Sequence, residues 1–113
     1  MGNREQALLD FTKTRINSFI KWDLVKFFYN NAHTMDTVEN IARDIGRKLE
    51  AVRPEIEDLV EDGILEKRVL NDKPIYSLTT NETIRTLVEQ FVLACENRFF
   101  RVKAVECIIR GIR

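Results

Sequence analysis

The chain has 113 residues, a length that fits one domain with a modest core. Its apolar fraction of 44% and charged fraction of 32% are those of an ordinary folded protein and argue against disorder. Eighteen basic residues balance eighteen acidic ones, whereas a dedicated non-specific nucleic-acid binder normally carries a basic excess. Any affinity for DNA must therefore come from local clusters of lysine and arginine.

Helical patterns fill the chain before residue 31. Residues 3–15 predict a lead-in helix, and its boundary with the next helix is not defined, so one helix or two both fit the sequence. From residue 16 to residue 30, apolar side chains recur at three- and four-residue steps and predict one buried face: Ile16, Phe19, Ile20, Leu24, Phe27 and Phe28. Aromatic residues in this stretch could stack on bases, but their helical spacing favours a core role.

Residues 36–78 predict a helix, a glycine turn, a second helix and a two-stranded ribbon. Asp36 or Thr34 can cap the first helix, and Asp36 has Glu39 three residues on, as in a capping box. Gly46 supplies the left-handed residue that ends this helix. The predicted strands are residues 64–69 and 74–78, and the polar turn between them is residues 71–73. This order is that of a winged helix-turn-helix.

Pro54 leaves the course of the second helix open. If the helix spans residues 49–61, the proline lies inside it, removes one hydrogen bond and kinks it. Alternatively, the helix begins near Arg53 and residues 49–52 form a separate turn.

One long helix is predicted from residue 82 to residue 112. Its apolar side chains follow alternating four- and three-residue steps, as in a coiled-coil seam, with Arg98 in one slot. The seam residues are Ile84, Val88, Phe91, Cys95, Val102, Val105, Ile109 and Ile112. We therefore predict a homodimer. The winged-helix domain with its lead-in helix takes residues 1–80, and the dimerisation helix takes residues 81–113.

Residues 21–78 resemble the winged-helix domain of small bacterial and archaeal regulators of the MarR-like and ArsR-like class. The residues that carry the resemblance are 38–46, 52–65 and 76–78. It implies a mainly α fold with a small β-hairpin wing and a homodimeric, DNA-binding transcriptional regulator. The second helix would enter the major groove of double-stranded DNA and the wing would touch phosphate or the minor groove. The implied DNA contacts are Arg47, Lys48, Ala51, Arg53, Lys67, Arg68 and Lys73.

Charge opposes this function. Between Arg47 and Asp62 there are three basic and six acidic residues, a net charge of three minus six, or −3. Carboxylates near phosphate weaken binding, although acids toward the end of the helix could point away from DNA. The alternative is a winged-helix interaction or scaffold module that does not bind DNA.

Other residues predict no enzyme, metal site or cofactor. His33 is the only histidine and lies in a predicted loop, far from Cys95 and Cys107 in sequence. No paired cysteines or Cys-His set for zinc and no glycine-rich phosphate loop are present. With two cysteines and neither a signal peptide nor a membrane-spanning run, the chain is predicted to be cytoplasmic with reduced thiols and no membrane partner. Phe91, Phe99 and Phe100 could line a ligand pocket at a dimer interface. The arginine-rich last segment favours a solvated helix face whose charges complement the helix dipole, and the alternative is a contact to DNA or to an acidic partner.

Overall fold

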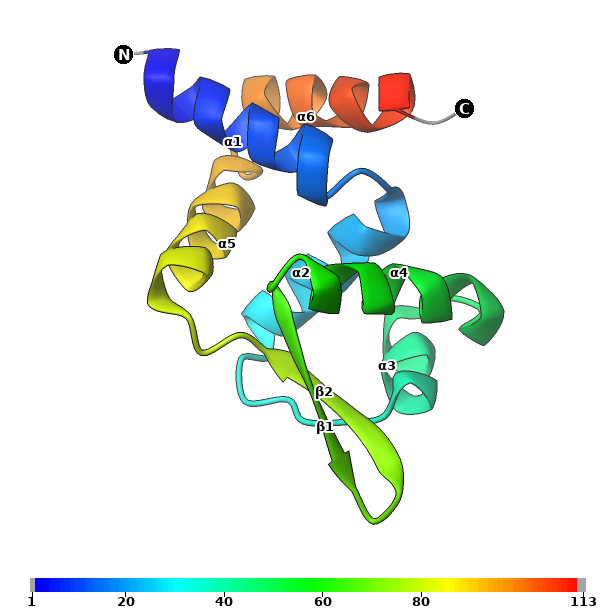
Figure 1. The fold of residues 1–113 in the computed structure, drawn as a ribbon. Helices are drawn as coiled ribbons and strands as arrows, with labels where there is room; N and C mark the ends of the chain where they lie inside the picture. The colour runs from blue at the N-terminus through cyan, green and yellow to red at the C-terminus, as the bar shows by residue number, and fades with distance from the viewer. Residues whose placement is uncertain (1, 112–113) are drawn as a thin grey trace.

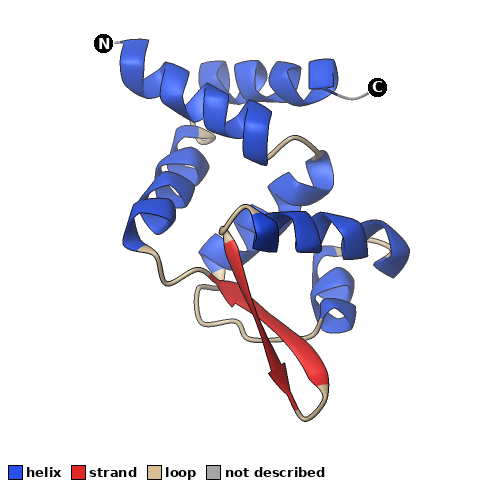
Figure 2. Cartoon of the chain, viewed as in Figure 1, coloured by secondary structure: helices blue, strands red, loops and turns tan. Residues whose placement is uncertain are grey.

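The helix, glycine turn, helix and hairpin predicted for residues 36–78 are present, with helices before and after them (Figures 1 and 2). The computed structural model describes residues 2–111. Its elements are α1 (Gly2–Arg15), α2 (Phe19–Asn30), α3 (Val38–Ile45), α4 (Leu49–Glu61), β1 (Leu65–Leu70), β2 (Lys73–Leu78), α5 (Glu82–Ala94) and α6 (Arg98–Gly111). The predicted mainly α, winged-helix-like class is confirmed. No helix within residues 2–111 combines the length and the apolar character needed to cross a membrane.

The turn between α3 and α4 is made by local side chains. Gly46 has φ of 72°, the left-handed conformation predicted for it, and its N–H bonds the Arg43 carbonyl at 3.1 Å. The predicted cap of α3 is wrong. Thr37 caps the helix by accepting from the Asn40 N–H at 3.3 Å, while Asp36 accepts from the Thr37 N–H at 2.8 Å.

The second helix is one element from Leu49 to Glu61 that contains Pro54. A start near Arg53 is therefore wrong. Proline has no N–H, so the Glu50 carbonyl one turn earlier lacks its helical donor. Because Pro54 is exposed, that carbonyl can be satisfied by water.

A two-residue turn closes the wing. Leu70 pairs with Lys73, and the intervening Asn71 and Asp72 both have positive φ, of 51° and 63°. Two positive φ values define the type I′ turn, and Asn and Asp tolerate that conformation. The segment before α3 also joins the wing, since the Tyr76 N–H donates to the Asp36 carbonyl at 2.8 Å. This third piece was not predicted from the sequence.

The prediction of one long C-terminal helix is wrong, because α5 and α6 are separate helices. The chain breaks before Arg98, where the Asn97 side chain accepts from the backbone N–H groups of Phe99 at 2.9 Å and Phe100 at 3.2 Å. This capping starts a new helix, and α6 then lies beside α1 (Figure 1), where Lys103 pairs with Glu5 at 2.8 Å.

The break divides the predicted dimer seam. Val88 and Phe91 are fully buried inside this one chain, whereas Val102 and Ile109 are exposed on α6. Ile112 lies outside the described residues. A second chain therefore cannot pack on Val88 and Phe91 as the chain is folded here.

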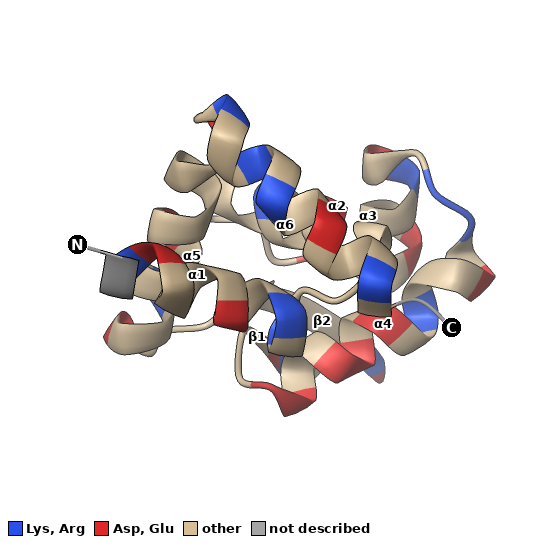
Figure 3. Ribbon diagram, turned by 90° about the horizontal axis from the view of Figure 1, so that it is seen from above, with Lys and Arg blue, Asp and Glu red and all other residues tan. Residues whose placement is uncertain are grey.

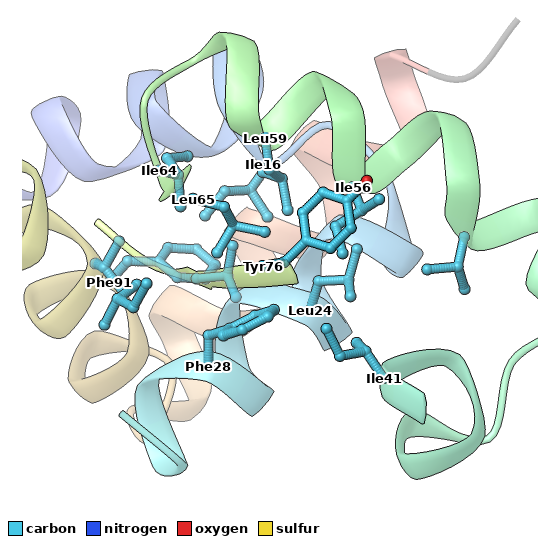
Figure 4. Close-up of a cluster of buried hydrophobic side chains, with 14 of the residues drawn as sticks. Ile16, Leu24, Phe28, Ile41, Ile56, Leu59, Ile64, Leu65, Tyr76 and Phe91 are labelled. Atoms are coloured by element: carbon cyan, nitrogen blue, oxygen red, sulfur yellow. The ribbon is translucent and has the colours of Figure 1, made fainter. Parts of the chain in front are cut away.

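The core combines side chains of residues 36–78 with side chains of the helices before and after them (Figure 4). Its largest fully buried side chains include Leu24 and Phe28 of α2, Ile56 and Leu59 of α4, and Phe91 of α5. The core interpretation of the aromatic cluster in residues 22–29 is confirmed, since all four rings are buried or packed against the core. Phe19, which was predicted to be buried, is instead 37% exposed.

Lys21 is the main departure from the predicted pattern within α2. In the sequence it falls between the apolar positions Ile20 and Leu24 of the predicted buried face, yet it is only 5% exposed. Its ammonium lies 3.1 Å from Asp58 and 3.7 Å from Glu55, both on α4, and donates to Asn17 at 2.8 Å. A buried charge is tolerated when it is paired in this way, so Lys21 joins α2 to α4.

We predict that Lys21→Met lowers the free energy of unfolding by about 1–2 kcal/mol. Methionine keeps much of the apolar stem but leaves Glu55 and Asp58 without their cation, and both carboxylates retain some contact with water. Urea denaturation measures the change. The matched control is Lys13→Met at an exposed position of α1, which should change stability by less than about 0.5 kcal/mol. Equal effects of the two substitutions would contradict the role given to Lys21.

Candidate nucleic-acid interface

The predicted DNA-contact residues gather at the start of α4 and on the wing. Arg47 and Lys48 precede the helix, Ala51 and Arg53 lie in its first turns, and all four are exposed. Lys67, Arg68 and Lys73 are exposed on the hairpin. A contact of 3.0 Å between Lys67 of β1 and Glu57 of α4 shows that the wing packs beside the helix.

Three of these cations are already paired with carboxylates of the same chain. The Arg47 guanidinium binds Asp23 of α2 at 2.7 Å. Arg53 binds Glu39 of α3 at 3.1 Å, and Lys67 binds Glu57. A fourth, Arg68, lies 3.9 Å from Glu66 on the same strand. The charge available to a phosphate is thus smaller than the count of basic residues indicates.

Lys48 and Lys73 are the two cations of this set without an acidic partner. Among residues 2–111, no carboxylate lies within 4.0 Å of either ammonium. Lys48 stands at the N-terminal end of α4 and Lys73 at the start of β2.

An acidic stripe runs along the solvent side of α4. We use this name for Glu50, Pro54, Asp58 and Glu61, which follow one another at steps of four, four and three and are all exposed. Red segments recur along α4 in Figure 3. Glu55 lies off this stripe, because it turns toward Lys21 and its side chain is only 22% exposed.

Glu57 is held at the junction of helix and wing. The hydroxyl of Tyr76, a residue only 3% exposed, donates to the Glu57 carboxylate, and the Lys67 ammonium lies 3.0 and 3.2 Å from its two oxygens. The Tyr76 bond lowers the pKa of Glu57 below its ordinary value, and Lys67 adds to the effect against an opposing contribution from burial. Burial, followed by the Glu57 bond and charge, raises the pKa of Tyr76. This contact was not predicted, because nothing local in the sequence marks the two residues as partners.

Cys95 is not activated as a nucleophile. Burial raises the pKa of Cys95 to about 11, so its thiol stays protonated at neutral pH and is a poor nucleophile. Cys107 is free and half-buried. Within residues 2–111, no cluster of three or more histidine, cysteine, aspartate or glutamate side chains could hold a metal ion.

Comparison with known proteins supports the architecture. No protein-family model and no curated protein matches the chain. Among solved structures, the chain is similar to a possible transcriptional regulator from Methanosarcina mazei Go1. The two share 19% sequence identity, with a TM-score of 0.50, over 85% of this chain and 79% of the other. At this identity the likeness shows the fold alone.

We predict that Tyr76→Phe raises the pKa of Glu57 toward its ordinary value of 4.5. The variant keeps the ring but loses a hydrogen bond to a charged group, which should lower the free energy of unfolding by about 1–2 kcal/mol at neutral pH. Because Glu57 has a lowered pKa in the folded chain, this stabilisation is complete above 4.5 and is lost as the pH falls through the folded value. The difference between wild type and variant should therefore shrink in acid.

NMR titration of the Glu57 carboxyl carbon and urea denaturation at several pH values measure the two effects. Tyr29→Phe is the matched control, because no side-chain hydrogen bond of the Tyr29 hydroxyl is present within residues 2–111. An unchanged Glu57 pKa in Tyr76→Phe would refute the assignment.

Proposed function

We propose that the chain is a homodimeric transcriptional regulator that binds double-stranded DNA through α4 and the wing. The observation that carries the proposal is the common exposed surface formed by the start of α4 and the hairpin, with Lys48 and Lys73 unpaired on it. The winged-helix fold places such a helix in the major groove and such a hairpin against the backbone. The similarity to a possible transcriptional regulator supports the same class of function.

The ion pairs determine how this surface binds. An exposed pair contributes only about 0.2–1 kcal/mol, so Arg47, Arg53 and Lys67 can exchange a carboxylate for a phosphate. Each exchange leaves a carboxylate unpaired near DNA, so little electrostatic free energy is gained. The unpaired Lys48 and Lys73 release counterions from DNA without this penalty. We therefore infer weak non-specific binding, with affinity depending on contacts to the bases.

Dimerisation is proposed through the outer face of α6. Phe99, Val102 and Ile109 are 79%, 55% and 57% exposed and follow one another at steps of three and seven, which places them on one side of the helix. The opposite side, with Phe100, Ala104 and Ile108, is buried. Large apolar side chains in such a row are typical of an interface between copies in a two-fold dimer.

The salt dependence of DNA binding tests the electrostatic part of the proposal. Two unpaired lysines per chain make four per dimer, so log K should fall against log salt with a slope of about −3.6. Fluorescence anisotropy with a labelled duplex from the region upstream of the protein's own gene measures the slope between about 50 and 200 mM salt. Asp23→Asn frees Arg47 and should steepen the slope to about −5.4, whereas the double variant Lys48→Ala with Lys73→Ala should bring it close to zero.

The control for these variants is Lys13→Ala on α1, which should leave the slope unchanged. If the wild type has no affinity above background at low salt, DNA binding is refuted.

The acidic stripe then favours the second function, a winged-helix module that binds a basic protein surface. That function requires a co-purifying partner that is lost when Glu50 and Glu61 are changed to lysine. Reversal at Glu55 or Glu57 is a poorer test, because those side chains bind Lys21 and Tyr76.

We predict that the wild-type chain sediments as a dimer at micromolar concentration and that Val102→Asp with Ile109→Asp makes it a monomer. Burying these new carboxylates in an interface would cost more than the packing gains. Val69→Asp on the wing is the matched control, since Val69 is 67% exposed and should leave the dimer intact. Analytical ultracentrifugation distinguishes the outcomes, and a monomeric wild type would end the dimer proposal.

A further inference from the structure

Glu50 places a carboxylate on the outer side of α4, near its start. It lies in the first turn of the helix, and its side chain is exposed. At about 100° per residue it is about 200° around the helix axis from Val52, which is fully buried. When a recognition helix enters the major groove, the residues of its first turns reach the base edges. A helix α4 bound in this way directs the Glu50 carboxylate at the bases.

No ion pair within the described chain involves this carboxylate. Among residues 2–111, no lysine or arginine nitrogen lies within 4.0 Å of Glu50. The acids that follow it on α4 differ, because Glu55 pairs with Lys21 and Glu57 pairs with Lys67. The exposed carboxylate of Glu50 is therefore available to a group outside the chain.

Hydrogen-bond chemistry limits the bases that Glu50 can face. An ionised carboxylate only accepts hydrogen bonds. In the major groove guanine presents the acceptors N7 and O6 and thymine presents the acceptor O4, so both edges repel a carboxylate. Adenine presents an N6 donor beside the N7 acceptor, whereas cytosine presents the N4 donor alone. Cytosine is therefore the base whose edge suits Glu50 best.

An apolar patch lies beside Glu50 on the same helix. Ala51 and Pro54 are exposed and three residues apart, and Pro54 is four residues from Glu50, so the three side chains are neighbours on the helix surface. Neither Ala51 nor Pro54 has a side-chain group that forms hydrogen bonds. Apolar side chains of this kind contact the C5-methyl group of thymine. A thymine next to the cytosine would thus meet the patch.

We propose that α4 reads a cytosine with an adjacent thymine on one strand of the half-site. Glu50 accepts a hydrogen bond from cytosine N4, and Ala51 and Pro54 contact the thymine methyl group. This assignment rests on the proposed binding of DNA through α4, and it adds which bases are selected and by which side chains. Glu50 contributes by rejecting acceptor edges as well as by binding the donor, so a helix of net negative charge can still discriminate between sites.

A carboxylate in the first turn also suits the positive end of the helix dipole. That role stabilises the helix to the same extent on every DNA sequence. A change of base preference on removal of the carboxylate therefore distinguishes base contact from a purely structural role.

Selection from a library of duplexes with randomised positions identifies the bound sequence. The wild type should enrich half-sites that carry a cytosine and an adjacent thymine on one strand, and Glu50→Ala should enrich sites without a preference at the cytosine position. Glu61→Ala is the matched control, since Glu61 is an exposed acid in the last turn of α4 and has no ion pair among residues 2–111. It should keep the cytosine.

Duplexes built on the enriched site measure the two contacts separately by fluorescence anisotropy. Replacing the C·G pair with T·A should weaken binding of the wild type about tenfold and that of Glu50→Ala less than about twofold. Deoxyuridine in place of the thymine removes only the methyl group and should weaken binding of the wild type about fourfold.

Failure of these base contacts is distinguishable from failure of DNA binding. No enriched sequence together with no affinity at low salt would overturn both the base contacts and the proposed function. An enriched site with the same base preferences in the wild type and Glu50→Ala would overturn the assignment of Glu50 alone, as would loss of the cytosine in Glu61→Ala. Equal binding of the thymine and deoxyuridine duplexes would overturn the methyl contact.

Discussion

The buried ammonium of Lys21 constrains the rest of the winged helix. A charge this far from water requires opposite charge close by, and Asp58 and Glu55 supply it from α4. The pairing sets the side of α4 that faces α2. With Ile56 and Leu59 in the core, the remaining side of the helix is left to solvent, and that side carries Glu50 and Glu61. The orientation of α4 that pairs Asp58 and Glu55 with Lys21 therefore also exposes Glu50 and Glu61.

Charge compensation continues around the helix. Asp23, Glu39 and Glu57 come from α2, α3 and α4, and each neutralises a cation of the predicted DNA surface. Glu57 does so while accepting the buried Tyr76 hydroxyl, so the contact that closes the wing on α4 also removes a positive charge from the wing. A surface arranged in this way has weak long-range attraction for phosphate.

Local chemistry explains which parts of the fold could be predicted. Gly46 and the Asn71-Asp72 pair require φ values that few other residues adopt, so they marked the helix turn and the hairpin correctly. The failures depend on distant partners. Residues 82–112 carry an apolar pattern with one interruption at Arg98, and the packing of α6 on the distant α1 accompanies its division into two helices.

The candidate site was predictable in position but not in charge. The resemblance to winged-helix regulators implied contacts at the start of α4 and on the wing, and these residues are exposed. It did not indicate their ion pairs, since Arg47 and Asp23 are 24 residues apart and Arg53 and Glu39 are 14 apart. No periodicity relates such pairs, and only the folded chain brings them together. The same holds for Lys21, whose spacing in α2 placed it outside the buried face until α4 covered it.

Three consecutive residues of α2 connect these features. Neighbouring side chains on a helix point about 100° apart, so Lys21, Trp22 and Asp23 reach in three directions. Lys21 binds α4, Trp22 packs on Phe91 of α5, and Asp23 binds Arg47 ahead of α4. One turn of α2 therefore contacts α4, α5 and the segment between α3 and α4, because its three side chains diverge.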